Sequence, residues 1–136
     1  KKGNALFLDC KDISHEYVPI NLEGYSWVLI NSKITHNLAV DSEYNKRRNS
    51  CERRVTQIAK SKNNVYSLRD VTTKDLEKVK TNVSPIDYLR ASYILEENDR
   101  VLRMMAALEQ GDAQKSGKIL LEGHWAMSSK FEITTA

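Results

Sequence analysis

The sequence lacks the residue patterns that define several large classes of protein. Its two cysteines, Cys10 and Cys51, are too few and too far apart for a disulfide scaffold, and its three histidines show no metal-ligand spacing with them. No apolar run approaches the roughly 20 residues that span a bilayer. These absences exclude a zinc domain and a membrane span, and they favour reduced, packed thiols in a soluble, cytoplasmic protein.

Charge of one sign and glycine are also scarce. The 21 basic and 18 acidic residues leave a net charge of +3, too little to require a nucleic acid or a membrane surface as partner. The five glycines are scattered, so the chain has no glycine-rich loop of the kind that cradles phosphate groups. With 40% hydrophobic and 29% charged residues over 136 positions, the composition suits a folded domain with a core of its own.

The first 30 residues contain three short apolar runs of strand length. Residues 5–10 and 16–20 are predicted to pair antiparallel, with Pro19 placing the second strand at an edge. The run at 27–30 (WVLI) is continuously apolar, too short for a helix and typical of a strand buried on both faces. We therefore predict a short antiparallel or mixed strand group in which residues 27–30 form the central strand.

A polar turn leads from that run into an amphipathic, basic helix. Asp41 is positioned to cap the helix, and Glu43 lies in its first turn, where a carboxylate interacts well with the helix dipole. The opposite face carries a surplus of lysine and arginine, including the KRR run at 46–48, and is expected to attract anions. Residues at helical spacing are predicted to face inward: Tyr44, Cys51, Val55, Ile58 and Ala59.

Three further helices are predicted in the second half of the chain. Thr72 or Thr73 caps a short helix at 74–81, and Ser84 followed by Pro85 opens a long helix that ends before Gly111. A last helix follows, capped by Asp112. The inward residues of these last two helices are predicted to be Ile86, Leu89, Tyr93, Val101, Met105 and Leu108, and then Ile119, Leu120, His124 and Met127. The fold class is therefore α+β, a short strand group followed by about four helices.

Two functions outside enzyme catalysis are compatible with this pattern. Several helices with a basic one among them permit a helix-turn-helix that binds nucleic acid. The basic residues do not continue onto the long helix, however, and the net charge is small. The other alternative is a non-enzymatic interaction module in which Tyr44 is buried and inert. Judged from periodicity alone, Tyr44 is a core residue of its helix.

One stretch of the chain resembles a known enzyme family. The run SEYNKRR at 42–48, with Cys51-Glu52 after it and Asn31-Ser32 and His36 before it, resembles the strand-to-helix segment of galactokinases. Galactokinases belong to the GHMP group of small-molecule kinases, which includes homoserine and mevalonate kinases. The likeness continues in order, and so covers almost the whole chain, through GNALFLDC at 3–10, Arg90-Ala91, Glu97-Asn98, Arg100-Val101, Gly111-Asp112, Gly117, His124 and Phe131-Glu132-Ile133.

The resemblance implies an ATP- and Mg²⁺-dependent kinase that phosphorylates the anomeric hydroxyl of D-galactose, or of a related sugar such as N-acetylgalactosamine. It implies that Tyr44 binds the sugar and that Lys33 and His36 lie near the phosphate groups, with no catalytic or metal-binding residue in the chain. Residues 1–22 would end the N-terminal domain of a two-domain GHMP-kinase fold. Residues 23–136 would begin its C-terminal domain.

The same resemblance implies that the chain is a central fragment. The phosphate loop and catalytic aspartate of the family would precede Lys1, and a second glycine-rich motif would follow Ala136, so both ends look truncated. We therefore expect the chain alone to be inactive and to bind neither ATP nor Mg²⁺. We also expect it to self-associate through apolar surface that the missing parts would cover.

Overall fold

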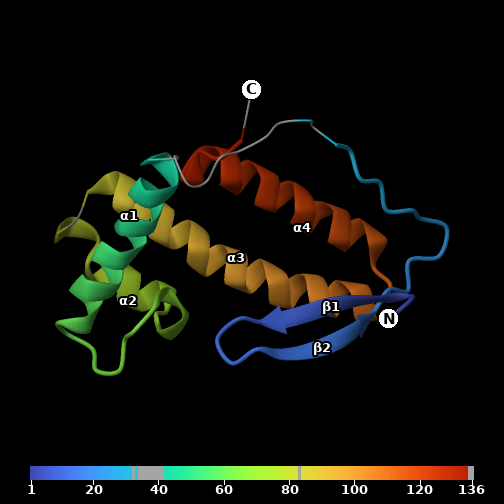
Figure 1. Ribbon diagram of the computed structural model, residues 1–136, viewed down its shortest axis with the longest axis horizontal. Coiled ribbons are helices and arrows are strands. Elements are labelled where there is room, and N and C mark those ends of the chain that lie inside the picture. Colours follow the sequence, from blue (N-terminus) through green and yellow to red (C-terminus); the bar gives the residue numbers. More distant parts are fainter. Residues whose placement is uncertain (32, 34–41, 83, 135–136) are drawn as a thin grey trace. The chain divides into compact units, whose positions relative to one another are not determined.

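The computed structural model describes residues 1–31, 33, 42–82 and 84–134 (Figure 1). In these residues a β-hairpin comes first and helices follow, which confirms the predicted α+β class. Short 3₁₀ turns lie at Leu68–Asp70 and Lys80–Asn82, and α4 continues into a π-helical turn at Met127–Phe131. The main elements are β1 (Asn4–Asp9), β2 (Ser14–Pro19), α1 (Ser42–Ala59), α2 (Thr73–Lys78), α3 (Pro85–Glu109) and α4 (Ala113–Ala126).

The chain forms two compact units. The first contains residues 1–31 and 99–123, and the second contains residues 32–98 and 124–136. Helices α3 and α4 each contribute residues to both units. The domain boundary that the resemblance implies between residues 22 and 23 stays a prediction.

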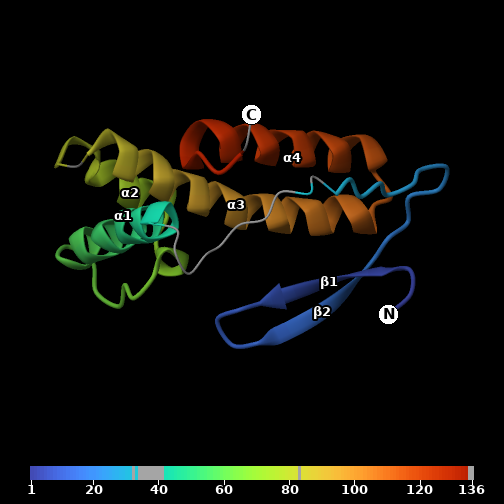
Figure 2. The same ribbon diagram turned by 45° about the horizontal axis from the view of Figure 1, so that its top comes forward.

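The first unit combines the hairpin with a pair of helix segments. Strands β1 and β2 pair antiparallel over their whole length, as the sequence predicts. The second half of α3 runs beside α4 in Figure 1 and in Figure 2, and Arg103 of α3 donates a hydrogen bond to Glu122 of α4 over 2.6 Å. The buried side chains of this unit include Val18, Ala107, Leu108, Ser116 and Ile119.

The turn between α3 and α4 requires glycine. Gly111 has a φ of +67°, in the left-handed region that favours glycine. A Cβ on Gly111 would lie only 2.7 Å from the backbone oxygen of Asn21, so the turn packs directly against the segment that follows β2. The helix end that the sequence predicts before Gly111 is therefore confirmed.

Residues 27–30 do not form a strand, and this prediction was wrong. The segment has no strand partner among the described residues, and its side chains are exposed, with Leu29 at 99%. An extended backbone becomes a strand only when its N–H and C=O groups pair with those of a neighbour. An apolar run shows that a segment suits burial, but it does not show that the covering partner lies in the same 136 residues.

The second unit has its core around α2 and the segment before it. Ser67 and Asp70 form a capping box at the first 3₁₀ turn, and Thr72 and Asp75 form another at the start of α2. The predicted short helix is thus confirmed, although its last residues form a 3₁₀ turn. The buried side chains of this core are Ile58, Val65, Leu68, Val71, Leu76, Val79 and Ala91.

The predicted inward faces of α3 and α4 were only partly right. Three of the predicted residues are buried: Tyr93, Leu108 and Ile119. Four others are exposed: Leu89, Val101, Leu120 and His124. The buried positions of these helices also include small side chains, namely Ala91, Ala107, Ser116 and Ala126. Because each helix contributes to two units, no single stripe of large apolar residues describes the face that packs.

Cys10 is exposed rather than packed, which corrects another expectation. It follows the end of β1, in the turn of the hairpin, and its side chain is exposed. Both cysteines are free thiols. In the described part of the chain, no helix combines the length and the apolar content needed to cross a membrane.

Candidate groove at the start of α1

Tyr44 lies in the first turn of α1 with 49% of its surface exposed. Of the residues that were predicted to share an inward face with it, Ile58 is buried, Cys51 and Val55 are half-buried, and Ala59 is exposed. The helix is anchored in the core at Ile58, near its C-terminal end, so its first turn lies outside that core. The interpretations of Tyr44 as a core residue, or as the buried and inert tyrosine of an interaction module, were therefore wrong.

Tyr44 lines a groove with a volume of about 810 Å³. The groove draws its walls from α1, residues 66–68, α3 and the C-terminal π-helical turn. Charged and hydroxyl side chains of α1 and Ser67 also line it. Its aromatic, aliphatic and thiol side chains are Tyr44, Cys51, Val55, Tyr66, Leu68, Ile94 and Phe131. An apolar lining with a few polar groups, at this size, is the usual composition of a small-molecule site.

The structure does not place the other two predicted site residues, Lys33 and His36, in the groove that Tyr44 lines. Lys33 is exposed, has a φ of +56° and is not among the residues that line the groove. His36 and the capping residue Asp41 lie outside the described residues. A phosphate-neighbouring role for Lys33 and His36 therefore stays a prediction.

A second cluster, which the sequence did not reveal, joins α1 to the start of α3. The two helices lie side by side there in Figure 1 and in Figure 2. Asp87 is 3% exposed and accepts two hydrogen bonds from Arg53, with Nε 2.7 Å from Oδ2 and Nη2 2.6 Å from Oδ1. The buried Arg54 adds a contact of 3.3 Å from Nη2 to Oδ2. The bond from Arg53 is the main cause that holds the pKa of Asp87 below its usual range.

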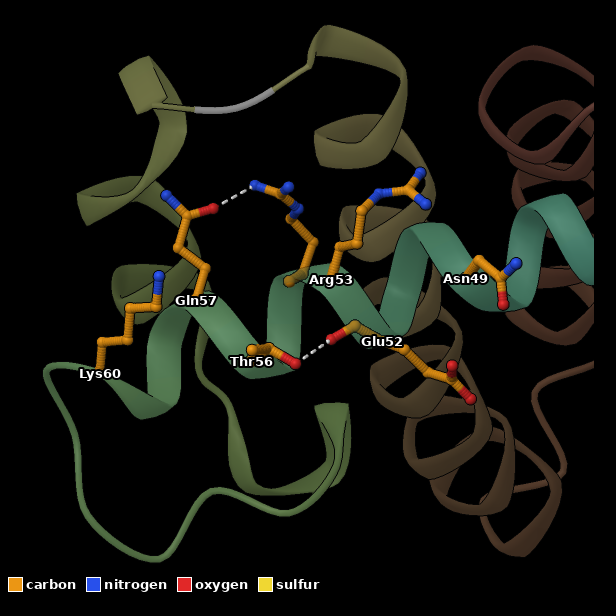
Figure 3. A pocket seen from close by; sticks show the side chains of 7 residues that line it. Asn49, Glu52, Arg53, Thr56, Gln57 and Lys60 are labelled. Carbon is orange, nitrogen blue, oxygen red and sulfur yellow. Dashed lines mark hydrogen bonds between the residues drawn. The ribbon is translucent and has the colours of Figure 1, made fainter.

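Figure 3 shows the outer side of this cluster, a pocket of about 520 Å³ along α1. Arg53, Gln57 and Lys60 extend to the same side of the helix in this view. Arg54 donates a hydrogen bond to Gln57, with Nη1 2.6 Å from Oε1. Because both arginines are committed to Asp87, and Arg54 to Gln57 as well, the arrangement is suited to holding two helices together.

Arg47 makes a further long-range contact that the sequence did not reveal. Its Nε donates to the backbone oxygen of Phe131 over 2.6 Å, and its Nη2 donates to the backbone oxygen of Glu132. The ring of Phe131 stacks on that of Tyr93, with centroids 4.6 Å apart. Sequence spacing gave no signal for this contact, because the partners are more than 80 residues apart and the acceptors are backbone atoms.

Cys51 is not equipped to act as a nucleophile in the groove. Burial raises the pKa of its thiol to about 11, so the thiol stays protonated at neutral pH. A reactive cysteine needs the opposite shift, since the thiolate is the nucleophile. Cys51 therefore contributes packing to the wall of the groove.

The charges of α1 argue against a nucleic-acid interface. Lys46 pairs with Glu43 and Arg48 pairs with Glu52, both within the helix. Arg53 and Arg54 pair with Asp87. A surface that binds phosphate groups by electrostatics presents its basic side chains to the ligand, whereas these are occupied by carboxylates. The helix-turn-helix alternative thus gains no support.

Comparisons with known proteins point to one enzyme family by name. No family model matches the chain. The chain is 40% identical over 134 residues to the galactokinase of Thermotoga petrophila, and 36% identical over 135 residues to that of Clostridium beijerinckii. Each match covers 98% of this chain but only 35% and 34%, respectively, of the relative. The chain thus spans about a third of the length of the curated relatives it matches.

The comparison with solved structures agrees with the comparison of sequences. The crystal structure of Lactococcus lactis galactokinase in complex with galactose superposes with a TM-score of 0.82, at 24% identity, over 98% of this chain and 34% of that one. At this identity the superposition by itself establishes the shared fold. In sequence and in fold, therefore, this chain is similar to a segment that makes up about a third of these galactokinases.

Proposed function

We propose that the chain forms part of a galactokinase, an enzyme that transfers the γ-phosphoryl group of ATP to the anomeric hydroxyl of D-galactose. The observation that carries the proposal is the 39–40% identity to Thermotoga galactokinases over 98% of the chain. A kinase for a related sugar such as N-acetylgalactosamine remains the alternative. The cytoplasmic location stays a prediction.

Within such an enzyme, this chain supplies one wall of the sugar site through Tyr44. Its half-exposed phenol at the start of α1, beside an 810 Å³ groove, is accessible to a ligand. A phenol hydroxyl exchanges hydrogen bonds with a sugar hydroxyl, while the ring packs against the sugar's apolar face. The structure solved with galactose for the Lactococcus enzyme, which has the same fold, supports a sugar site in this family of folds.

ATP and Mg²⁺ would be held by residues outside this chain. Among the described residues, no group of three histidine, cysteine, aspartate or glutamate side chains is arranged to hold a metal ion. The scattered glycines do not form a phosphate-binding loop. We therefore assign no step of phosphoryl transfer to these residues. The expectation that the chain alone binds no ATP stays a prediction.

The activity is tested on the complete protein that carries this segment. A coupled assay measures ADP release with galactose, N-acetylgalactosamine and glucose as acceptors. The proposal expects galactose to give the highest kcat/KM. Turnover of N-acetylgalactosamine alone would favour the kinase for a related sugar. Absence of turnover with every sugar would contradict both proposed activities.

Replacing Tyr44 with phenylalanine in the complete enzyme is expected to raise the KM for galactose by roughly 2- to 12-fold. The change removes one neutral hydrogen bond, worth about 0.5–1.5 kcal/mol, and keeps the ring. Because the bond is present in ground and transition states alike, kcat and the KM for ATP should change little. Steady-state kinetics with each substrate varied in turn checks this. Unchanged kinetics would instead show that the Tyr44 hydroxyl makes no contact with the sugar.

The chain alone is expected to self-associate through residues 25–30. Tyr25, Trp27 and the three aliphatic residues that follow are all exposed, so the segment presents a run of apolar side chains. Sedimentation velocity over a range of concentrations should show a dimer or larger species, reduced by Leu29→Ser. A purely monomeric profile at high concentration would count against this prediction.

A further inference from the structure

We propose that Arg47 is a positioning residue for Tyr44: it ties the start of α1 to the C-terminal turn at Phe131 and Glu132, and so fixes the direction of the tyrosine hydroxyl. The inference rests on the proposed function, because it concerns how the sugar-binding tyrosine is held. It adds a role for Arg47, a residue within the run at 42–48 to which the resemblance gave no function.

The contact itself is two-pronged. Arg47 Nε lies 2.6 Å from the backbone oxygen of Phe131, and Nη2 donates to the backbone oxygen of Glu132. Carbonyl groups at the end of a helical segment have no partner within that segment, and they carry partial negative charge. A planar guanidinium with two parallel donors therefore satisfies both oxygens and fixes its own orientation in doing so.

The turn that Arg47 grips is itself held on α3. The Phe131 ring stacks on the buried Tyr93 ring at an interplanar angle of 25°. The Glu132 carboxylate lies 3.3 Å from Nη2 of the buried Arg90, and Lys130 pairs with Glu96. Each of these partners belongs to α3, so the turn gives Arg47 a firm point of attachment.

Tyr44 and Arg47 are adjacent on the surface of α1. Residues three apart in a helix lie on the same face, one turn from each other. Tyr44, Arg47 and Phe131 all line the same groove. The neighbouring Lys46 pairs instead with Glu43 within the helix. Arg47 is thus placed to transmit the position of the C-terminal turn to the first turn of α1.

The inference predicts a dependence between two residues, which a double-mutant cycle measures. In the complete enzyme, Arg47→Gln should raise the KM for galactose by no more than Tyr44→Phe does, roughly 2- to 12-fold, because it acts through the same hydrogen bond. The KM for ATP should stay within about twofold. In the Tyr44→Phe background, Arg47→Gln should have almost no further effect on the KM for galactose.

Two further variants make the result decisive. Lys46→Gln removes a neighbouring positive charge of α1 and should leave the KM for galactose unchanged. Arg47→Lys keeps the charge but loses the two-pronged geometry, and should give a rise smaller than that of Arg47→Gln. If Arg47→Gln does not fold, Arg47→Lys replaces it in the cycle.

The outcomes separate the inference from the proposed function. A lowered melting temperature with an unchanged KM in Arg47→Gln would show a purely structural role and overturn the inference. So would an equal rise in KM in both backgrounds, because Arg47 would then act independently of Tyr44. If Tyr44→Phe alone leaves the KM for galactose unchanged, the sugar contact and the inference both fail, while galactokinase activity is judged separately by the coupled assay.

Discussion

Replacing Leu76 with alanine is expected to lower the free energy of unfolding of the chain by about 2–5 kcal/mol. Leu76 is fully buried on α2, in the core that also contains Ile58 and Val79. The change removes buried methyl groups and leaves a cavity that the capped, short helix cannot readily close. Since small domains are stable by only about 5–15 kcal/mol, a loss of this size is a large share of the total. Urea titration followed by circular dichroism measures it.

Leu120→Ala is the matched control for this experiment. The same substitution is made on α4, at a residue that is 54% exposed, so the free energy of unfolding should change by no more than about 0.5 kcal/mol. The pair also tests which face of α4 is covered, because the apolar spacing of the sequence predicted Leu120 to be buried. Equal losses at the two positions would contradict the structure.

Asp87→Ala is expected to cost about 3 kcal/mol, the lower end of the range for breaking a buried ion pair, because Arg53 is half-exposed. The substitution leaves the guanidinium of the buried Arg54 without its carboxylate. Among the described residues, no atom accepts a hydrogen bond from Nε of Arg54. The guanidinium of Arg54 would therefore keep few hydrogen bonds to offset the cost of its burial. Urea titrations of the two proteins at pH 7 give the difference.

The stabilisation from Asp87 should also depend on pH. The pKa of Asp87 is lowered in the folded state, mainly by Arg53, so the folded protein favours the ionised carboxylate. The contribution is therefore fully present above the unfolded pKa of about 4 and is lost as the pH falls through the folded value. The difference in the free energy of unfolding between wild type and Asp87→Ala should stay constant from pH 7 to about 5 and become smaller below about pH 4.

Glu52→Ala provides the comparison for an exposed pair. Glu52 accepts a hydrogen bond from Arg48 over 2.8 Å, but both side chains are more than half exposed, so the loss of stability should be much smaller than that of Asp87→Ala. If Asp87→Ala lowers the free energy of unfolding no more than Glu52→Ala does, or if its effect is the same at pH 3 as at pH 7, then the ion pairs of Asp87 do not stabilise the contact between α1 and α3.

Local chemistry explains why much of the fold could be predicted. The side chains of Thr72 and Asp75 each accept a hydrogen bond from the other residue's backbone N–H, which favours a helix start at this point. Ser84 followed by Pro85 also favours a helix start, because proline suits the first helical position. The hairpin follows from two strand-like runs with a short polar link between them. Each of these elements is specified by residues fewer than 20 positions apart.

The wrong predictions have one origin. The spacing of apolar residues does not show which other segment packs against them. The run at 27–30 is as apolar as a buried strand, but pairing depends on a second backbone. Leu120 has helical spacing with His124, but only packing decides which side of α4 is covered. Periodicity alone favoured the core for Tyr44 on the same ground, whereas the core residue of its helix is Ile58.

The sequence by itself determined the hairpin, the order of the helices and the resemblance to galactokinases, because these depend on residue identity and short spacing. Only the tertiary structure decided that Asp87 locks α1 to α3 and that Arg47 reaches Phe131 and Glu132 across more than 80 residues. Charged side chains such as these have long, rotatable stems and accept any suitably placed partner, a carboxylate or a carbonyl alike. Their choice of partner is fixed by how the helices pack, and no periodicity in the chain records it.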